Sequence, residues 1–225
     1  PLITIVLGTR PEAIKFAPLI LKLKSTSNLR VRVVLTGQHK EMVSQVMKLF
    51  DLKSDNNLFL MSPNQTLTHI TCETLKGLRE DFNTFPPNLV LVQGDTTTAF
   101  ASSLAAFYEN IPVGHLEAGL RTNDLYNPFP EEANRRLISQ ISKLHFAPTK
   151  NAEENLNKSG ITENIFVTGN TVIDALLLIA KKTVSIDFEK INWEKNKVLL
   201  VTLHRRENWG DNLIDIAKGV LDVLK

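Results

Sequence analysis

The sequence predicts an α/β protein built on a doubly wound parallel sheet. Apolar runs rich in Val and Ile alternate along the chain with segments of helical period, and these runs are nearly continuous in apolar residues. Strands of that kind are typical of parallel sheets that helices cover on both faces. The segments that follow the runs are rich in glycine, cations and carboxylates, and parallel sheets bind ligands beyond the carboxyl ends of their strands.

The predicted strands are the apolar runs. The first, Leu2–Leu7, opens the chain and leads directly into Gly8. The remaining predicted strands are Val31–Thr36, Leu89–Gln93, Pro112–His115, Leu144–Ala147, Ile165–Thr168 and Val198–Leu203.

Helical periodicity fills most of the segments between these strands. Pro11 suits the first turn of a helix, where its missing N–H costs nothing, and Glu131 follows Pro130 at another helix start. The predicted helices are Pro11–Ser25, His39–Leu49, Thr66–Phe82, Thr97–Tyr108, Glu131–Ser142, Asn151–Ser159 and Thr171–Lys182, and the chain ends inside a further helical pattern, "IAKGVLDVLK".

Composition excludes several classes of protein. The chain has 225 residues and is 43% hydrophobic, enough to bury a core, and its single cysteine, Cys72, gives neither a disulfide framework nor a thiolate metal cluster. Lys and Arg outnumber Asp and Glu by only 26 to 24 and are dispersed, which argues against nucleic acid and favours a small partner. Apolar stretches such as Leu176–Ala180 are far shorter than the roughly 20 residues of a membrane span. We therefore predict a cytoplasmic protein.

A domain boundary is predicted near Gly169. Residues 1–168 form the regular strand and helix array, whereas Thr183–Asn196 is polar and irregular. We expect residues 169–225 to be a linker and the first βα part of an incomplete second domain. The first residue lies inside a strand pattern and the last inside a helix pattern, as in a fragment.

Chemistry-bearing residues collect after the strands. The segments are "GTRPE" (8–12), "GQH" (37–39), "GDTTT" (94–98), "LEAGLRT" (116–122), "PT" (148–149), "GNT" (169–171) and "HRREN" (204–208). Turn and capping preferences alone explain residues such as Thr149 and Asn170. They do not explain the repeated arginine, histidine and carboxylate.

The segment "GTRPE" predicts a phosphate or diphosphate grip. Gly8 permits a tight turn, Pro11 begins the helix, and free N–H groups at a helix start attract an anion. Arg10 lies at that end and Lys15 about one turn further on. The Gly-rich dinucleotide fingerprint and the Gly-Lys-Ser/Thr phosphate loop are both absent from the sequence, so no nicotinamide cofactor is predicted.

Three carboxylates are candidates for acid–base chemistry. Asp95 and Glu117 each follow a strand and converge on one crevice, where one carboxylate shifts the pKa of the other. For Glu131 two interpretations have equal weight. One is acid–base chemistry, and the other is the ordinary stabilisation of a helix N-terminus by an acidic residue, about 0.3–1 kcal/mol. No pair of histidines has the helical spacing of metal ligands, so no metal site is predicted.

Seven stretches together resemble the non-hydrolysing UDP-N-acetylglucosamine 2-epimerases. They occur in order along the whole chain: "GTRPEAIKFAPLI", "GQH", "QGDTTTAFASSLAAFY", "PVGHLEAGLRT", "PFPEEANRR", "TGNTVIDAL" and "HRREN". The resemblance implies two Rossmann-like domains around a cleft, as in B-type glycosyltransferases, with most uridine-binding residues beyond Lys225. It also implies a homodimer and a product used in surface polysaccharide synthesis.

The family reaction interconverts UDP-N-acetylglucosamine and UDP-N-acetylmannosamine. No carbonyl acidifies the C2 hydrogen, so loss of UDP from C1 with removal of the C2 proton avoids a free carbanion. The proton then returns to the other face, which requires two acid–base groups. By resemblance the catalytic set is Asp95, Glu117, Glu131 and His204, with Arg10 and Lys15 on the substrate and diphosphate.

Two further assignments come from the resemblance. Arg205 and His204 follow the first strand of the second domain and would place positive charge against the leaving diphosphate. Gln38 and His39, with Arg205, match part of an activating UDP-sugar site. Some relatives carry glutamine and arginine where this chain has Glu41 and Asn64. The activating site therefore matches the family pattern less completely than the catalytic set does.

Three hypotheses about function remain open at this stage. The first is the epimerase, and the second is a hydrolysing relative or a UDP-sugar transferase that uses the same cleft. The third is an inactive truncated domain that binds a sugar nucleotide without turnover. Identifying the product separates the first two, because the hydrolysing branch releases free N-acetylmannosamine.

Overall fold

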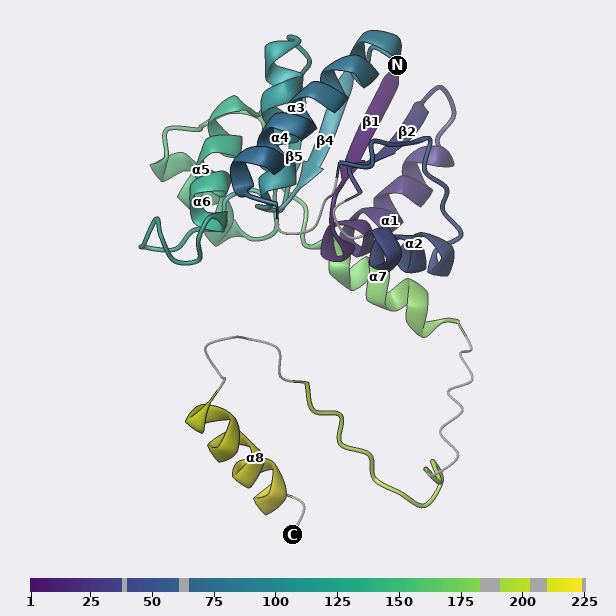
Figure 1. The fold of residues 1–225 in the computed structure, drawn as a ribbon, viewed down its shortest axis with the longest axis vertical. Coiled ribbons are helices and arrows are strands. Elements are labelled where there is room, and N and C mark those ends of the chain that lie inside the picture. Colours follow the sequence, from purple (N-terminus) through teal and green to yellow (C-terminus); the bar gives the residue numbers. More distant parts are fainter. Residues whose placement is uncertain (38–39, 61–64, 183–190, 203–209, 224–225) are drawn as a thin grey trace. The chain divides into compact units, whose positions relative to one another are not determined.

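A computed structural model describes residues 1–37, 40–60, 65–182, 191–202 and 210–223 of the chain (Figure 1). The chain divides into two compact units, residues 1–182 and residues 183–225. The first unit holds the sheet and the candidate site, and each unit is described by itself.

The first unit is built on a seven-stranded sheet in the order β3-β2-β1-β4-β5-β6-β7, with every neighbouring pair parallel. This confirms the predicted fold class. Six predicted strands are present, with bounds that differ by at most one residue, and the short strand Asn56–Asn57 was not predicted because two polar residues give no apolar run. The strands are β1 (Leu2–Leu7), β2 (Arg30–Leu35), β3 (Asn56–Asn57), β4 (Leu89–Gln93), β5 (Val113–Leu116), β6 (Leu144–Ala147) and β7 (Ile165–Val167).

Helices cover both faces of this sheet (Figure 1). Right-handed crossovers place the helices that lead toward β3 on one face and those that lead toward β7 on the other. One face packs against α1 (Arg10–Lys24), α2 (Lys40–Leu49) and α7 (Thr171–Ala180). The other carries α3 (Leu67–Thr84), α4 (Thr97–Tyr108), α5 (Glu131–Ile141) and α6 (Lys150–Lys158).

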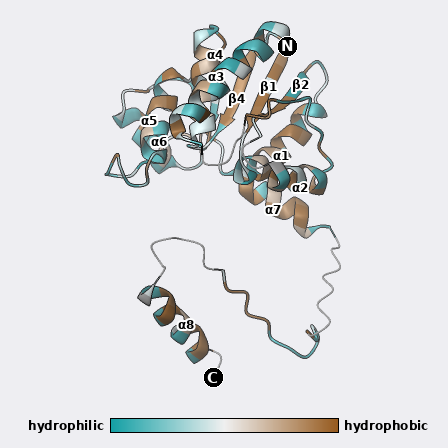
Figure 2. Ribbon diagram, in the orientation of Figure 1, coloured by the Kyte–Doolittle hydropathy of each residue, from teal (hydrophilic) through white to brown (hydrophobic). Residues whose placement is uncertain are grey.

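Strand β1 shows why the apolar runs are continuous. All six of its residues are buried. Ile5 and Leu7 belong to the cluster with α1, whereas Val6 belongs to the cluster with α3 and α4. Successive side chains of a strand point to opposite faces, so a central strand covered on both sides must be apolar at nearly every position. Figure 2 shows β1 and β4 as hydrophobic along their length.

Strands β1 and β4 are neighbours, and the chain leaves them in opposite directions across the sheet. Their following helices, α1 and α4, therefore lie on opposite faces. Open α/β sheets bind ligands at the carboxyl edge, where the chain leaves two neighbouring strands toward opposite faces. The candidate residues of the β1–α1 and β4–α4 loops lie at this topological switch point.

Helix α7 belongs to the first unit, because it packs against α1 and buries Ala175. The compact unit therefore extends to residue 182, beyond the predicted division at residue 168. Whether residues 169–225 begin a second nucleotide-binding domain stays a prediction.

The second unit contains one helix in its described part, α8 (Asp211–Val223). The predicted strand Val198–Leu203 is wrong over residues 198–202, which have no regular structure and are exposed, and Leu203 lies outside the described residues. A strand needs a neighbour for its backbone hydrogen bonds, and the described residues of this unit include no other strand.

Candidate functional site

The β1–α1 loop packs directly against the start of α4. A Cβ atom added to Gly8 would lie 2.8 Å from Thr98 Cγ2, closer than side chains pack, so only glycine fits there. The sequence analysis explained Gly8 by a tight turn. The structure adds a second reason for glycine, since Thr98 leaves no room for a side chain.

Glu117 is the centre of the first cluster of polar side chains. It follows β5 directly and has a φ of 64°, a left-handed backbone conformation that residues other than glycine rarely adopt. One carboxylate oxygen, Oε2, accepts hydrogen bonds from Gln93 and from Lys15, whose Nζ lies 2.5 Å away. The other, Oε1, accepts from Asn170 Nδ2 at 2.8 Å. Residues from α1, β4 and the start of α7 therefore fix this carboxylate.

A small cavity of about 20 Å³ adjoins the cluster and is lined by Lys15, Glu117 and Asn170 among others. That is room for about one water molecule. The side chains of Lys15 and Glu117 are 22% and 14% exposed, so both are reachable from solvent while most of their surface is covered. A partly buried carboxylate with a cation beside it is suited to proton transfer.

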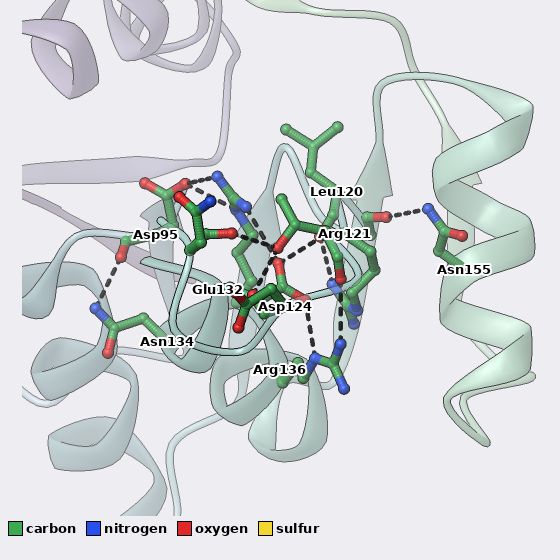
Figure 3. Close-up of polar contacts among 12 residues, drawn as sticks. Asp95, Leu120, Arg121, Asp124, Glu132, Asn134, Arg136 and Asn155 are labelled. Carbon is green, nitrogen blue, oxygen red and sulfur yellow. Dashed lines mark hydrogen bonds and ion pairs between the residues drawn. The ribbon is translucent and has the colours of Figure 1, made fainter. Parts of the chain in front are cut away.

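Asp95 lies in a second cluster, on the β4–α4 loop (Figure 3). Its Oδ2 atom accepts from two nitrogens of Arg135, Nε at 2.8 Å and Nη2 at 2.6 Å. Its backbone carbonyl accepts from Asn134 Nδ2 at 2.8 Å. Helix α5 thus holds the loop through both the side chain and the backbone of Asp95.

The neighbouring residues Glu131 and Glu132 have opposite environments. Glu132 is fully buried and accepts from Arg136 at 2.8 Å, from the Thr122 N–H at 3.0 Å and from Arg135 at 3.2 Å (Figure 3). Burial raises the pKa of Glu132, but these three donors outweigh it and hold the pKa below its usual range. Glu131 is only partly buried, and within the described part of the chain its side chain has no hydrogen-bond or ion-pair partner. The residues around Glu132 therefore hold it in place, whereas the side chain of Glu131 is partly exposed and has none of these contacts.

Glu12 occupies the start of helix α1. Its Oε2 atom accepts from the N–H groups of Gly8 and Thr9, both at 2.6 Å, and its Oε1 accepts from the Thr96 hydroxyl at 2.6 Å. The N–H groups of Gly8 and Thr9, which precede α1, are therefore not open to a ligand. A carboxylate of the chain already binds them, because the "TRPE" segment folds as a capping box. The predicted anion site at the first turn of the helix stays a prediction.

His115 is the most deeply buried titratable group of the sheet. Its side chain is fully buried, and Nε2 lies 2.7 Å from the Gly94 carbonyl oxygen, which can only accept, so Nε2 carries the proton. Burial lowers the pKa of His115 to about 4, against the hydrogen bond to Gly94, which favours the charged form. The neutral ring donates a hydrogen bond to Gly94, the residue directly before Asp95.

A family model described as UDP-N-acetylglucosamine 2-epimerase matches residues 21–225. The chain belongs to the UDP-N-acetylglucosamine 2-epimerase family.

Relatives match over nearly the whole of this chain. The UDP-N-acetylglucosamine 2-epimerases of Neisseria meningitidis and Escherichia coli K12 are 49% and 48% identical over 98% and 97% of it. A crystal structure of the Neisseria meningitidis UDP-GlcNAc 2-epimerase bound to UDP-GlcNAc superposes with a TM-score of 0.76 and 53% identity, covering 79% of this chain and 49% of that one. The chain spans 61% and 60% of the length of the two curated relatives.

Within this epimerase family member, the first unit brings together some predicted site residues. Lys15 meets Glu117, whereas Asp95 meets Arg135. Arg10 begins α1 with an exposed side chain that has no hydrogen-bond partner among the described residues. The other predicted residues, Gln38, His39, His204 and Arg205, lie outside the described residues.

Four residues of the candidate site were missed by sequence reasoning: Glu12, Gln93, Arg135 and Asn170. Arg135 stands in the quoted motif "PFPEEANRR", of which only a glutamate was assigned a role. Asn170 was interpreted as a turn residue, and it does cap α7, but its amide group also donates to Glu117. The amide oxygen of Asn170 caps the helix and its amide nitrogen donates to Glu117. The sequence pattern indicates the cap, whereas the contact with Glu117 is visible only in the structure.

The described residues contain no helix that is both long and apolar enough to cross a membrane. Nor does this part of the chain contain a group of three or more histidine, cysteine, aspartate or glutamate side chains placed to hold a metal ion.

Proposed function

We propose that the protein containing this chain interconverts UDP-N-acetylglucosamine and UDP-N-acetylmannosamine. The observation that carries the proposal is the placement of Glu117 and Asp95 on adjacent loops, after the paired strands β4 and β5, with Lys15 against Glu117. The UDP-GlcNAc bound in the structure of the Neisseria meningitidis relative supports the substrate class.

The chemistry follows from the substrate. Its C2 hydrogen has no adjacent carbonyl, so direct deprotonation leaves an unstabilised carbanion. A base that takes the C2 proton while the C1–O bond to UDP breaks gives a glucal and UDP instead. Returning the proton to the opposite face, with re-addition of UDP at C1, completes the inversion. Two acid–base groups, one for each face, satisfy this scheme.

The proposed roles rest on the environments of the side chains. Glu117 is oriented by three donors and Asp95 by Arg135, which fixes two carboxylates. Glu131 has no partner among the described residues and is free to approach a sugar. We assign proton transfer to this set of three, without dividing the two faces among its members.

Cations complete the proposed site. Arg10 is exposed at the start of α1, and Lys15 is partly exposed beside Glu117. We place both on the substrate and its diphosphate. His204 and Arg205 keep their proposed place against the leaving diphosphate, where positive charge stabilises the bond-breaking step. The Gln38 and His39 activating site, the homodimer, the polysaccharide pathway and the cytoplasmic location stay predictions of the sequence.

Solvent isotope incorporation tests the reaction. The naturally expressed protein that contains this chain is incubated with UDP-N-acetylglucosamine in deuterated buffer. We expect deuterium at C2 of the UDP-N-acetylmannosamine product and transient free UDP. Inversion without deuterium would overturn the elimination route, and free N-acetylmannosamine as the sole sugar product would identify a hydrolysing enzyme.

A further inference from the structure

Glu12 is a buried carboxylate to which the proposed reaction assigns no role. Its side chain lies at the switch point between β1 and β4, and the residue is only 2% exposed. Its carboxylate accepts hydrogen bonds from the N–H of Gly8, the N–H of Thr9 and the hydroxyl of Thr96. It therefore joins two loops that are more than 80 residues apart in sequence.

An ordinary capping box does not require this arrangement. Its glutamate accepts from the N-cap N–H and is commonly exposed to water at the helix end. Here the second carboxylate oxygen leaves the helix and accepts from Thr96, the N-cap residue of α4. One side chain therefore ends at the caps of two helices on opposite faces of the sheet.

Burying this carboxylate has a cost that helix capping alone does not demand. Burial raises the pKa of Glu12, and the hydrogen bonds from Thr96, Gly8 and Thr9 oppose that shift. An exposed glutamate at the same helix position would stabilise the helix start without desolvation. The buried carboxylate therefore links the segment before α1 to the segment before α4, in addition to capping α1.

The two loops carry candidate site residues at their tips. Arg10 is the first residue of α1, two positions before Glu12, and Asp95 directly precedes Thr96. Gly8 also packs closely against Thr98, the second residue of α4, which is a second contact between the β1–α1 loop and the segment that follows β4. The position of Arg10 relative to Asp95 is thus set by Glu12 and by this close contact.

We propose that Glu12 is a positioning residue that fixes the spacing between the Arg10 loop and the Asp95 loop across the switch point. The catalytic part of this inference rests on the proposed function. The loop-coupling part does not, since it concerns hydrogen bonds of the free protein. Glu12 makes no contact with substrate in this scheme, and its effect on turnover passes through Asp95.

Two substitutions separate geometry from charge. Glu12→Ala removes all three contacts. Glu12→Gln keeps an oxygen for the Gly8 and Thr9 N–H groups and presents an N–H to the Thr96 oxygen, so it preserves the link without the negative charge. Glu80→Ala, at an exposed glutamate of α3, is the matched control.

The first measurement is amide hydrogen exchange at Gly8, Thr9 and residues 95–97, in the naturally expressed protein without substrate. We expect faster exchange at both loops in Glu12→Ala and near-normal exchange in Glu12→Gln and Glu80→Ala. Faster exchange at Gly8 and Thr9 with no change at residues 95–97 would overturn the coupling, because Glu12 would then only cap α1.

The second measurement is steady-state epimerisation below the unfolding temperature of each variant. A displacement of about 1 Å in a catalytic group lowers rate by about a hundredfold, so we expect kcat of Glu12→Ala to fall by about that factor, with KM changed less than threefold. Glu12→Gln should recover at least a tenth of the wild-type kcat. A normal kcat in Glu12→Ala would refute the positioning role. If the wild-type protein does not epimerise, the proposed function fails, and the exchange data still decide the coupling.

Discussion

Lys15 Nζ and Glu117 Oε2 lie 2.5 Å apart although 102 residues separate them in sequence. The sequence alone assigns them different tasks, Lys15 to the substrate and diphosphate and Glu117 to proton transfer. Their contact means that the cation also controls the carboxylate. A charged partner at this distance orients the carboxylate.

Substituting Lys15 tests this pairing. A hydrogen bond to a charged group contributes about 1.5–3 kcal/mol, and we therefore expect Lys15→Met to lower kcat by about tenfold to a hundredfold. The measurement is steady-state kinetics with UDP-N-acetylglucosamine. Lys24→Met, at an exposed position of the same helix, should retain wild-type kcat. A twofold or smaller effect of Lys15→Met would show that the pairing has no part in turnover.

The adjacent residues Glu131 and Glu132 give a matched pair of opposite predictions. Glu131→Gln should lower kcat by at least about a hundredfold, as expected for loss of an acid–base group. It should lower the free energy of unfolding by no more than about 1 kcal/mol, the contribution of an acidic residue at a helix N-terminus, since the described residues offer its side chain no partner.

Glu132→Gln should instead lower the free energy of unfolding by about 3 kcal/mol, because it removes the buried negative charge that accepts from Arg135, Arg136 and the Thr122 N–H. Kinetics and urea unfolding on both variants check the pair. The assignment is wrong if Glu131→Gln keeps normal turnover or if Glu132→Gln is as stable as the wild type.

Arg135 is predicted to be needed as arginine. Two of its nitrogens contact Asp95 and a third contacts Glu132. A lysine has one nitrogen and cannot make both contacts. We expect Arg135→Lys to lower kcat by about tenfold, the effect of losing about 1.4 kcal/mol of orientation. Arg30→Lys, at an exposed residue of β2, serves as the control, and equal kinetics for the two variants would argue against a role for Arg135.

Acid should destabilise the first unit through His115. The folded-state pKa of about 4 lies below the ordinary value of 6.5, so between these pH values the unfolded chain binds a proton that the folded chain does not. Stability conferred by the neutral ring is present above pH 6.5 and is lost as the pH falls toward 4. The difference corresponds to about 3 kcal/mol.

His115→Gln keeps a nitrogen donor for the Gly94 carbonyl and cannot titrate in this range. We expect the wild type to lose about 3 kcal/mol more than this variant between pH 7 and pH 4, measured by urea unfolding with circular dichroism. His69→Gln, at an exposed position of α3, should follow the wild type. Parallel pH profiles for His115→Gln and the wild type would contradict the prediction.

Periodicity and composition were sufficient for the sheet and its helices. Strands such as β1 and β4 are apolar at nearly every position because both faces are covered, and that pattern is visible in the sequence. The two-residue strand β3 left no such pattern. The run Val198–Leu203 has the pattern, yet its described residues form no strand, because pairing depends on a neighbouring strand rather than on composition.

By itself, the sequence determined the fold class, the edge of the sheet where polar residues gather, and the identity of Asp95, Glu117, Lys15 and Arg10 as candidates. Only the tertiary structure decided which of them meet: Lys15 with Glu117, Asp95 with Arg135, and Glu12 with Thr96. It also decided that Glu132 is buried among cations while Glu131 has no partner in the described part of the chain. The physical reason is that hydrophobic periodicity is a local property of the chain. A hydrogen bond between residues 40 to 102 positions apart instead depends on where the sheet order places their strands.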